Sequence, residues 1–226
     1  VKLLAPVDPP RNVMCVGKNY SDHIAEVAAA RGSDDPMSAA PTYPVFFTKA
    51  PQCIIADKET VPLHANLTKW LDYEVELAVV IGRAGKDIAP EYVREHIFGY
   101  TIANDITARE LQKSHKQWFK GKSLDGTCPI GPCIVPASHM DADDLLLRTY
   151  VNGELRQNSR TSKMIFDIPS IVSSLSAGMT LLRGDTILTG TPDGVGFAMK
   201  PPQVLKAGDE VTLEVEGIGR LTNFVA

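Results

Sequence analysis

Short apolar runs, bounded by Gly, Pro, Asn and Asp, dominate the hydrophobic pattern of the chain. Such runs are typical of strands, and a run that alternates with polar residues indicates a strand with one exposed face. The predicted strands lie in "VMCVGKNY", "PVFFTKA", "CIIA", Tyr73 to Ile81, "YTIANDIT", "PCIVPA", "LLLRTYVNGELRQN", "DTILTG" and "DEVTLEVEGIGRLTN". Asn152-Gly153 and Gly217 to Gly219 are predicted to be hairpin turns, because Asn and Gly readily adopt the backbone conformation of a tight turn.

Helical patterns are fewer and shorter. "YSDHIAEVAAARG" is predicted to be a helix with Ser21 or Asp22 as its N-cap and with its end at Gly32. Further helices are predicted after Pro90, from Ala108 to about Trp118, and in "FDIPSIVSSLSAGMTLL". Residues 32–44, rich in Ser, Asp, Pro and Ala, are predicted to form a surface loop. Strands outnumber helices and do not alternate with them regularly, which favours a β-rich α+β fold over a doubly wound sheet.

The predicted strand from Tyr73 to Ile81 contains two acidic residues in apolar surroundings. Glu74 and Glu76 are two residues apart, so they project to the same face. Apolar residues continue that face and also make up the opposite one: Ala78 and Val80 on the first, Tyr73, Val75, Leu77 and Val79 on the second. The strand should therefore be buried on both sides. Two buried carboxylates would be severely destabilising unless cations, protons or a metal ion neutralise them.

A second Glu-Val-Glu sequence, at Glu214 and Glu216, serves as an internal control. There Thr212 extends the carboxylate face as a polar residue, while the opposite face is apolar. This is the ordinary alternation of a strand with one side in water. The sequence Glu-Val-Glu by itself therefore indicates nothing unusual, and the apolar continuation beyond Glu74 and Glu76 is what distinguishes them.

Two explanations for Glu74 and Glu76 remain open: a buried ion pair with Lys or Arg, or a metal site. Asp105, at the end of an otherwise apolar predicted strand, would supply a third carboxylate. Three carboxylates without Cys or His at ligand spacing favour a hard cation, Mg²⁺ or Mn²⁺. Asp105 would alternatively cap a helix that begins near Thr107, and this explanation also remains open.

Three further groups are candidates for chemistry. His23 and Glu26 are three residues apart and share a helix face, so the carboxylate would orient the imidazole and raise its basicity. On an exposed helix such a pair is often only solvated. Lys120 and Lys122 flank a glycine, and either would serve as a counter-charge to the carboxylates or simply lie on the surface. The loop "LTGTPDGVG" has glycines that let its backbone approach a carboxylate closely.

Composition and charge exclude several classes of function. The 226 residues carry a formal net charge of -4, and their basic residues are scattered, unlike those of a nucleic-acid-binding protein. Apolar runs are far shorter than the roughly 20 residues that span a bilayer. The 4 cysteines are too few and too irregularly spaced for a disulfide framework, which favours a reducing, cytoplasmic setting. Because the chain opens on Val1 rather than methionine, we expect that a segment precedes it.

Seven motifs, taken in order, resemble the fumarylacetoacetate hydrolase family: "VGKNYSDHIAE", "LDYEVELAVVIG", "YTIANDITARELQ", "QWFKGKSLDGTCPIGP", "VNGELRQ", "MIFDIPSIV" and "LTGTPDGVG". The resemblance extends over nearly everything after about Asn12, and the ordered set is far more specific than any single motif. It implies a mixed β-sandwich roll with a few short helices and a homodimer. Residues 12–226 would form the catalytic domain, preceded by a proline-rich lead-in of residues 1–11.

The resemblance also implies roles for individual residues. Glu74, Glu76 and Asp105 would be the ligands of Mg²⁺ or Mn²⁺. His23 with Glu26 would activate water, and Lys122 would be the active-site lysine. The implied substrate contacts are Arg109, Gln112, Gly190 and Thr191. The founding hydrolase has a further metal-binding aspartate seven residues before the histidine. Here that position is Val16, as in the smaller acylpyruvase-like members, so water would replace that ligand and fumarylacetoacetate itself is not the expected substrate.

The implied function is metal-dependent hydrolysis of a C–C bond in 2,4-dioxo acids of the acylpyruvate type. The products would be pyruvate and a carboxylic acid, formed through a metal-stabilised enolate. His23 would take a proton from the attacking water, and Lys122 would help to stabilise the enolate. Oxaloacetate decarboxylation and isomerisation of 2-hydroxyhepta-2,4-diene-1,7-dioate use the same enolate chemistry and remain open. A non-catalytic keto-acid-binding protein is a further alternative, which would have no use for His23, Glu26 or Lys122.

Overall fold

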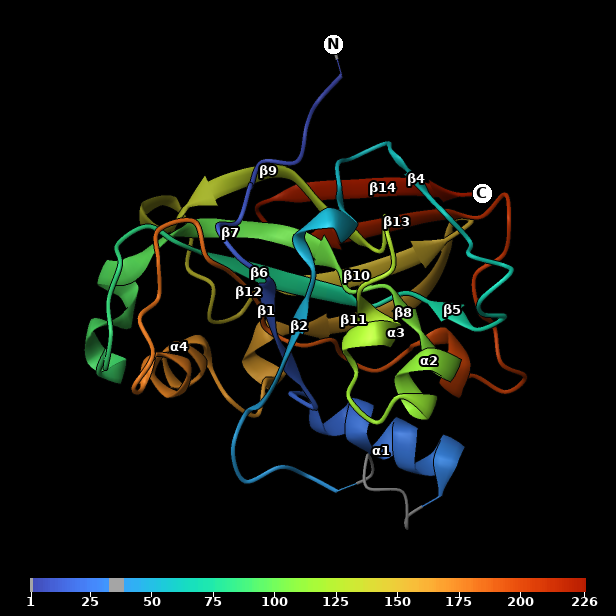
Figure 1. The fold of residues 1–226 in the computed structure, drawn as a ribbon, viewed down its shortest axis with the longest axis horizontal. Helices are drawn as coiled ribbons and strands as arrows, with labels where there is room; N and C mark the ends of the chain where they lie inside the picture. The colour runs from blue at the N-terminus through green and yellow to red at the C-terminus, as the bar shows by residue number, and fades with distance from the viewer. Residues whose placement is uncertain (1, 33–38) are drawn as a thin grey trace.

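Two β-sheets packed face to face form the body of the molecule (Figure 1). The computed structural model describes residues 2–32 and 39–226. The larger sheet has 7 strands in the order β2-β1-β12-β6-β7-β9-β3, and the smaller sheet has 5 in the order β11-β10-β13-β14-β4. Most neighbouring strands are antiparallel, but β1 with β12, β14 with β4 and β3 with β9 are parallel. The β-rich mixed fold predicted from the sequence is confirmed.

The strands are short in most cases. Those of the larger sheet are β1 (Val13–Gly17), β2 (Val45–Lys49), β3 (Ile54–Ile55), β6 (Val75–Ile81), β7 (Ile97–Asn104), β9 (Cys128–Pro136) and β12 (Thr186–Leu188). Those of the smaller sheet are β4 (Thr60–Val61), β10 (Leu146–Val151), β11 (Glu154–Arg160), β13 (Glu210–Val215) and β14 (Gly219–Val225). The two remaining strands, β5 (Leu71–Asp72) and β8 (Thr107–Ala108), pair with each other beside the larger sheet.

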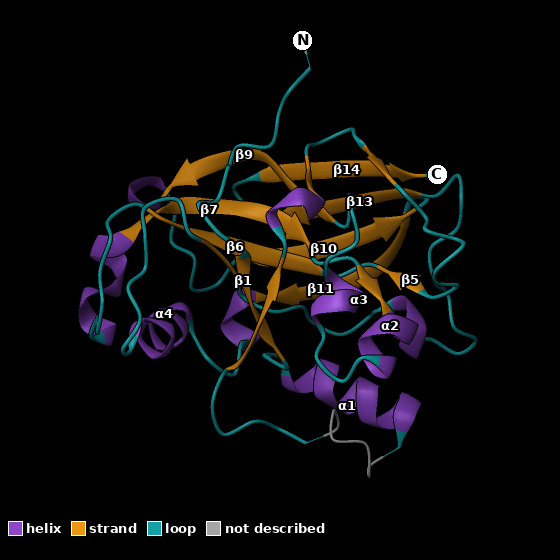
Figure 2. Cartoon of the chain, in the orientation of Figure 1, coloured by secondary structure: helices purple, strands orange, loops and turns teal. Residues whose placement is uncertain are grey.

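Helices contribute little of the chain and lie at the edges of the sheets (Figure 2). The α-helices are α1 (Ser21–Arg31), α2 (Arg109–Ser114), α3 (Phe119–Lys122) and α4 (Ile168–Ser176), and the 3₁₀ helices are η2 (Pro51–Cys53), η3 (Pro90–His96), η4 (Ala137–His139), η5 (Thr161–Lys163) and η6 (Gly196–Ala198). Helices α1, α2 and α3 gather on one side of the molecule, near β5 and β8, while α4 lies apart from them (Figure 1). Within residues 2–32 and 39–226, no helix is long and apolar enough to cross a bilayer.

Strand β6 is buried along its whole length, as its apolar pattern predicted. One face of β6 packs in the main hydrophobic core together with residues of the smaller sheet such as Leu147 and Leu213. On the other face, Ala78 belongs to a smaller cluster that includes Cys15 and Cys128. Glu76 projects from this second face. The carboxylate is therefore held by a strand whose position both clusters fix.

Most of the predicted elements are confirmed, including the helix that ends at Gly32 and the Asn152-Gly153 hairpin turn. The control sequence also behaves as predicted, because Glu214 and Glu216 lie at the surface and pair with arginines. Part of the predicted loop 32–44 falls on residues 33–38, which lie outside the described residues.

Several predicted boundaries are wrong. Glu74 precedes β6 rather than lying within a strand that begins at Tyr73, because β5 ends at Asp72 and β6 begins only at Val75. Helix α1 has Tyr20 as its N-cap, without a side-chain cap hydrogen bond. The segment after Pro90 is a 3₁₀ helix, and the predicted helix from Ala108 is split into α2 and α3.

Shortening Leu77 should destabilise the fold, since its side chain is 0% exposed in β6. We expect Leu77→Ala to lower the free energy of unfolding by about 2–5 kcal/mol, the usual effect of removing a buried leucine side chain. Urea denaturation followed by circular dichroism measures this change. The matched control is Leu155→Ala in β11, where the side chain is 47% exposed, and its effect should stay within about 0.5 kcal/mol. Equal losses in both variants would contradict the assignment of the core.

Candidate active site

Three carboxylates converge at the ends of β6 and β7. Glu74 and Glu76 lie just before and within the start of β6, and Asp105 directly follows β7. Antiparallel pairing sets Val75 opposite Asn104, and the Asp105 N–H donates to the Glu74 carbonyl oxygen at 2.9 Å. One carboxylate oxygen from each of the three acidic residues lies within 4.8 Å of the others. Strand pairing therefore assembles an acidic cluster from residues that are distant in sequence.

Buried cations compensate part of this negative charge. The Lys122 ammonium donates to Glu74 Oε2 at 2.7 Å and to Asp105 Oδ2 at 2.6 Å. Arg109 Nη1 lies 2.6 Å from Glu74 Oε1, and Lys49 Nζ lies 2.9 Å from Asp105 Oδ1. The ion pair that the sequence left open is thus present for Glu74 and Asp105. The alternative role of Asp105 as a helix cap is wrong, because α2 begins at Arg109 with Ala108 as its N-cap.

The ion pairs decide which form of each group is stable. Burial disfavours the charged forms of both Glu74 and Lys122, but their contacts outweigh it. Lys122 and Arg109 lower the pKa of Glu74, and Asp105 and Glu74 raise the pKa of Lys122. Arg109 also pairs with Asp72 through its Nη2 at 2.9 Å. These buried side chains are therefore held as charged pairs.

Glu76 differs from its neighbours. Among the described residues no Lys or Arg side chain forms an ion pair with it, and its Oε2 accepts a hydrogen bond from the Gly190 N–H at 2.6 Å. Burial, Asp105 and Glu74 together raise the pKa of Glu76 well above its usual value. A carboxylate in this situation favours a proton or a bound cation. Carboxylate oxygens are the ligands that hard divalent cations prefer, so Glu74, Glu76 and Asp105 fit such an ion.

Helix α1 brings His23 and Glu26 to the same region. His23 Nδ1 lies 3.4 Å from Glu26 Oε2, longer than the about 2.7–3.2 Å of a usual N–H···O hydrogen bond. Both oxygens of Glu26 accept from the Gly194 N–H at 3.0 Å. At Gly194 φ is +95°, and a Cβ there would lie 2.1 Å from the Arg156 carbonyl oxygen, so the turn requires glycine. Glu26 therefore anchors α1 to the loop after β12 as well as facing His23.

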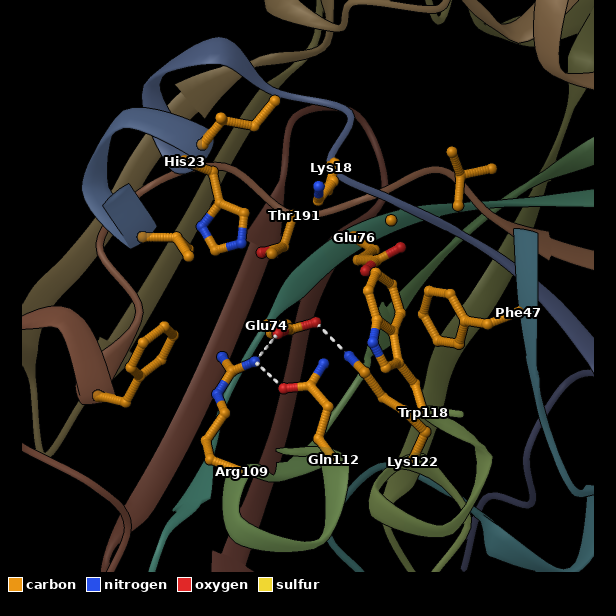
Figure 3. A pocket seen from close by; sticks show the side chains of 15 residues that line it. Lys18, His23, Phe47, Glu74, Glu76, Arg109, Gln112, Trp118, Lys122 and Thr191 are labelled. Atoms are coloured by element: carbon orange, nitrogen blue, oxygen red, sulfur yellow. Dashed lines mark hydrogen bonds and ion pairs between the residues drawn. The ribbon is translucent and has the colours of Figure 1, made fainter. Parts of the chain in front are cut away.

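A pocket opens between α1, the loop after β12 and the helices α2 and α3 (Figure 3). Its empty space, solvent at the opening included, is about 510 Å³. Charged and polar side chains line one part and apolar side chains the rest: Lys18, His23, Glu74, Glu76, Arg109, Gln112, Lys122 and Thr191, with Val16, Gly17, Ile24, Val27, Phe47, Trp118 and Phe197. In the view of Figure 3, His23 and Lys122 lie on opposite sides of Glu74.

The structure brings all the predicted site residues into this region. Seven of them line the pocket: His23, Glu74, Glu76, Arg109, Gln112, Lys122 and Thr191. The other three do not line the pocket but contact residues that do. Asp105 contacts Lys122, Glu26 faces His23, and Gly190 donates to Glu76. Of the two candidate lysines, Lys122 is 2% exposed and paired with the carboxylates, whereas Lys120 lies at the surface. The catalytic and binding roles assigned to these residues stay predictions.

Two neutral side chains of the pocket have donors that their neighbours orient. Gln112 Oε1 accepts from Arg109 Nη1 at 3.5 Å, and its amide nitrogen points into the pocket (Figure 3). Thr191 Oγ1 accepts from Gln157 Nε2 at 2.9 Å. A hydroxyl that accepts from one partner can donate its own proton to another. Gln112 and Thr191 can therefore both donate hydrogen bonds to oxygen atoms of a ligand.

Two buried charged residues of the site were not predicted from the sequence. Asp72 pairs with Arg109 and also accepts from the Gly196 N–H at 2.8 Å. It precedes Glu74 by two positions, so the same alternation that relates Glu74 to Glu76 could have identified Asp72 from the sequence. Lys49 ends strand β2 and is fully buried, with Nζ 3.0 Å from the Ile106 carbonyl oxygen. Only the pairing of β2 with β1 carries Lys49 under Asp105, so the sequence pattern held no sign of it.

The fold and the pocket define an α+β protein with a buried acidic cluster at the base of a pocket. The family profile for the C-terminal part of fumarylacetoacetate (FAA) hydrolase matches residues 12–226. The chain belongs to the fumarylacetoacetate hydrolase family of enzymes.

Individual proteins of known sequence or structure are similar to the chain. It is 49% identical over 227 residues to the oxaloacetate tautomerase YisK of Bacillus subtilis, covering 100% of this chain and 73% of the relative. A fumarylacetoacetate hydrolase from Exiguobacterium antarcticum has a TM-score of 0.90 at 52% identity, covering 100% of this chain and 78% of that one. A 2-hydroxyhepta-2,4-diene-1,7-dioate isomerase from Mycobacterium marinum has a TM-score of 0.82 at 42% identity, covering 99% and 77%.

The raised pKa of Glu76 gives the metal-free protein a defined pH dependence. The folded state keeps the Glu76 proton at pH values where the unfolded state has released it. The free energy of unfolding should therefore fall as pH rises from the ordinary carboxyl range towards the folded-state pKa. We expect Glu76→Gln to remove this part of the slope, because glutamine does not ionise. Urea denaturation in EDTA at a series of pH values measures it.

Mg²⁺ provides the control for that measurement. At 100 times its dissociation constant it should add about 2.7 kcal/mol to the unfolding free energy of the wild type, and much less to Glu76→Gln. If both proteins show the same pH slope and the same stabilisation by Mg²⁺, Glu76 neither has a raised pKa nor binds the cation.

Proposed function

We propose that this protein interconverts the keto and enol forms of a small 2-oxo acid in the presence of Mg²⁺ or Mn²⁺. One observation carries the proposal: Lys122, shared by two carboxylates of an acidic cluster, and His23 line the same pocket from different sides. Enolisation needs a base for the proton on C3 and a positive field at the 2-oxo oxygen, where negative charge develops. The name of the similar B. subtilis protein, oxaloacetate tautomerase, supports the same class of reaction.

His23 is the proposed base. Its Nδ1 faces the Glu26 carboxylate, and a ring nitrogen next to a carboxylate carries the proton of the neutral imidazole. The other ring nitrogen, Nε2, is then an acceptor on the pocket side. In the proposed reaction Nε2 takes the proton from C3 and returns it to the 2-oxo oxygen, so no atom is gained or lost. Reprotonation at C3 reverses the reaction.

Lys122 is proposed to stabilise the charge that develops on the 2-oxo oxygen. Two of its three N–H groups are used by Glu74 and Asp105, which leaves one for a ligand. Its Nζ also lies 5.0 Å from the centre of the Phe47 ring, so water is kept from this side of the ammonium. Gln112 and Thr191 would donate to the carboxylate of the substrate. A divalent cation held by Glu74, Glu76 and Asp105 would polarise the 2-oxo and carboxylate oxygens as a Lewis acid.

Hydrolysis of 2,4-dioxo acids, predicted from the sequence, is the second candidate. The contact between His23 and Glu26 also favours hydrolysis, because a base that can take a proton from carbon can also take one from water. The 3.4 Å separation of His23 Nδ1 and Glu26 Oε2 is loose for activation of water, although such contacts often tighten when a substrate binds. Decarboxylation of oxaloacetate and isomerisation of hydroxy-diene dioates use the same pocket and remain alternatives.

The surroundings of the enzyme are also proposals. We infer a reducing, cytoplasmic setting from the cysteines, all four of which are free. A homodimer, implied by the family resemblance, stays a prediction that sedimentation equilibrium can check. No partner other than a small molecule is proposed.

The proposed reaction can be followed by the ultraviolet absorbance of the enol form of oxaloacetate. With Mg²⁺ the wild type should speed conversion to the keto form well above the rate without protein, and EDTA should remove the effect. His23→Ala should lower kcat by about 10²–10⁴-fold, the usual contribution of a general base. Its folding is checked by circular dichroism. The matched control is His139→Ala at the surface, which should keep the wild-type rate.

Product analysis separates the alternatives. If the protein forms pyruvate and a carboxylic acid from acylpyruvates but does not accelerate the enol–keto conversion, its function is hydrolysis. Release of CO₂ that persists in His23→Ala would identify a decarboxylase, because loss of CO₂ needs no base for C3. Binding of 2-oxo acids without turnover of any of them would support the non-catalytic keto-acid-binding protein.

A further inference from the structure

Gln157 is a buried polar side chain that connects the smaller sheet to the pocket. It lies on β11 and is 0% exposed, and it is not among the residues that line the pocket. Strand β11 packs tightly against the loop after β12, because a Cβ at Gly194 would lie 3.1 Å from the Gln157 Cα. Gln157 therefore lies next to this loop without a surface of its own in the pocket.

The side-chain amide of Gln157 has a partner at each of its four hydrogen-bonding positions. Oε1 accepts from the Val75 N–H at 3.0 Å and from the Thr149 hydroxyl at 2.8 Å. Nε2 donates to Thr191 Oγ1 and to the Pro192 carbonyl oxygen, both at 2.9 Å. A glutamine amide has two acceptor positions and two N–H donors, so all of them are used.

These partners also fix the orientation of the amide. A backbone N–H can only donate and a carbonyl oxygen can only accept. Val75 therefore requires the oxygen of Gln157, and Pro192 requires its nitrogen. The reverse orientation would set two donors against each other at Val75 and two acceptors at Pro192, and unpaired polar groups in the interior are costly. The nitrogen of Gln157 is therefore directed at Thr191.

The fixed amide determines what Thr191 offers to the pocket. Thr191 Oγ1 accepts from Gln157, which leaves its hydroxyl proton for another acceptor. Thr191 lines the pocket, and in the view of Figure 3 it lies between His23 and Glu76. A hydroxyl that accepts a hydrogen bond is polarised by it and becomes a stronger donor. Thr191 is therefore a directed donor for an oxygen atom of a ligand.

We propose that Gln157 is a positioning residue, which keeps the Thr191 hydroxyl as a hydrogen-bond donor for the carboxylate of the substrate. The inference rests on the proposed function for the place of that carboxylate. Gln157 does not touch the substrate and takes no part in proton transfer. Because Val75 lies between Glu74 and Glu76, the same side chain also links Thr191 to the acidic cluster.

A double-mutant cycle measures whether Gln157 acts through Thr191. Calorimetric titration with pyruvate, with Mg²⁺ present, gives the dissociation constants. Thr191→Val removes the hydroxyl and keeps the shape, and should weaken binding about 10-fold, the usual effect of losing a hydrogen bond to a charged group. Gln157→Met should weaken binding about 3-fold, and should have no further effect when combined with Thr191→Val. Combined with Thr191→Ser, which retains a hydroxyl, its effect should return.

Steady-state kinetics with oxaloacetate separates positioning from a general disturbance of the fold. The substrate carboxylate keeps its charge during enolisation, so a weaker bond to it should raise KM and leave kcat unchanged. Gln157→Met should therefore raise KM about 3-fold, whereas a disturbed fold would lower kcat as well. The matched control is Asn158→Met, at the next and exposed position of β11, which should keep the wild-type KM and kcat.

NMR of the wild-type protein tests the contact without a substitution at Gln157. A ligand that accepts the Thr191 proton changes the hydrogen bond between Thr191 and Gln157, since linked hydrogen bonds polarise one another. Titration with pyruvate should therefore shift the signals of the Gln157 side-chain amide. The same titration of Thr191→Val should leave these signals in place.

Three outcomes would overturn the proposal. If the effects of Gln157→Met and Thr191→Val multiply in the double variant, Gln157 only supports the fold. If the amide signals of the wild type do not move when pyruvate binds, Gln157 does not sense the bond that Thr191 makes. If Thr191→Val binds pyruvate as the wild type does, Thr191 does not hold the carboxylate.

Exchange of the methyl protons of pyruvate in D₂O, followed by NMR, tests the proposed function separately. If exchange is absent while the double-mutant cycle shows the expected coupling, the enolisation is rejected and the role of Gln157 stands. If exchange occurs without that coupling, the enolisation stands and the role of Gln157 is rejected.

Discussion

A chain of buried ion pairs with alternating sign connects the fold to the pocket. It runs through Asp72, Arg109, Glu74, Lys122, Asp105 and Lys49, with separations between 2.6 and 2.9 Å. Each internal member contacts a partner on both sides, so the chain neutralises itself. Loss of one member would leave a buried charge without its partner, which is strongly destabilising. Glu76 lies beside this chain as an additional carboxylate that no Lys or Arg of the described residues neutralises.

The ion pairs also explain how such short helices are held in place. Helix α2 has 6 residues and α3 has 4, too few to be stable alone. Arg109 opens α2 and Lys122 closes α3, and each is fixed by carboxylates from the strand side. Phe197, 4.5 Å from the Arg109 guanidinium, and Val27 of α1 belong to a small apolar cluster that packs beside them. Charge pairing and packing together close the pocket on this side.

Much of the candidate site was predictable from the sequence because its residues come in short local patterns. Glu74 and Glu76 were recognisable by alternation within an apolar run, and His23 and Glu26 by their helical spacing. The ordered motifs connected these patterns to a family, and that connection implied the mixed β-sandwich roll. Asp72 could have been found by the same alternation. Lys49 could not, since a lysine at the end of a strand is ordinarily exposed and only strand order buries this one.

By itself the sequence determined that carboxylates lie at the start of a strand buried on both faces, because periodicity fixes which residues share a face. It did not determine what neutralises them, since opposite charges far apart in sequence meet only when the sheet has formed. The tertiary structure decided that Lys122 rather than Lys120 is the partner and that Glu26 anchors α1 to Gly194. It also decided that the ion-pair explanation holds for Glu74 and Asp105. Glu76 has no Lys or Arg partner among the described residues, and the three carboxylates lie close enough together to hold a cation.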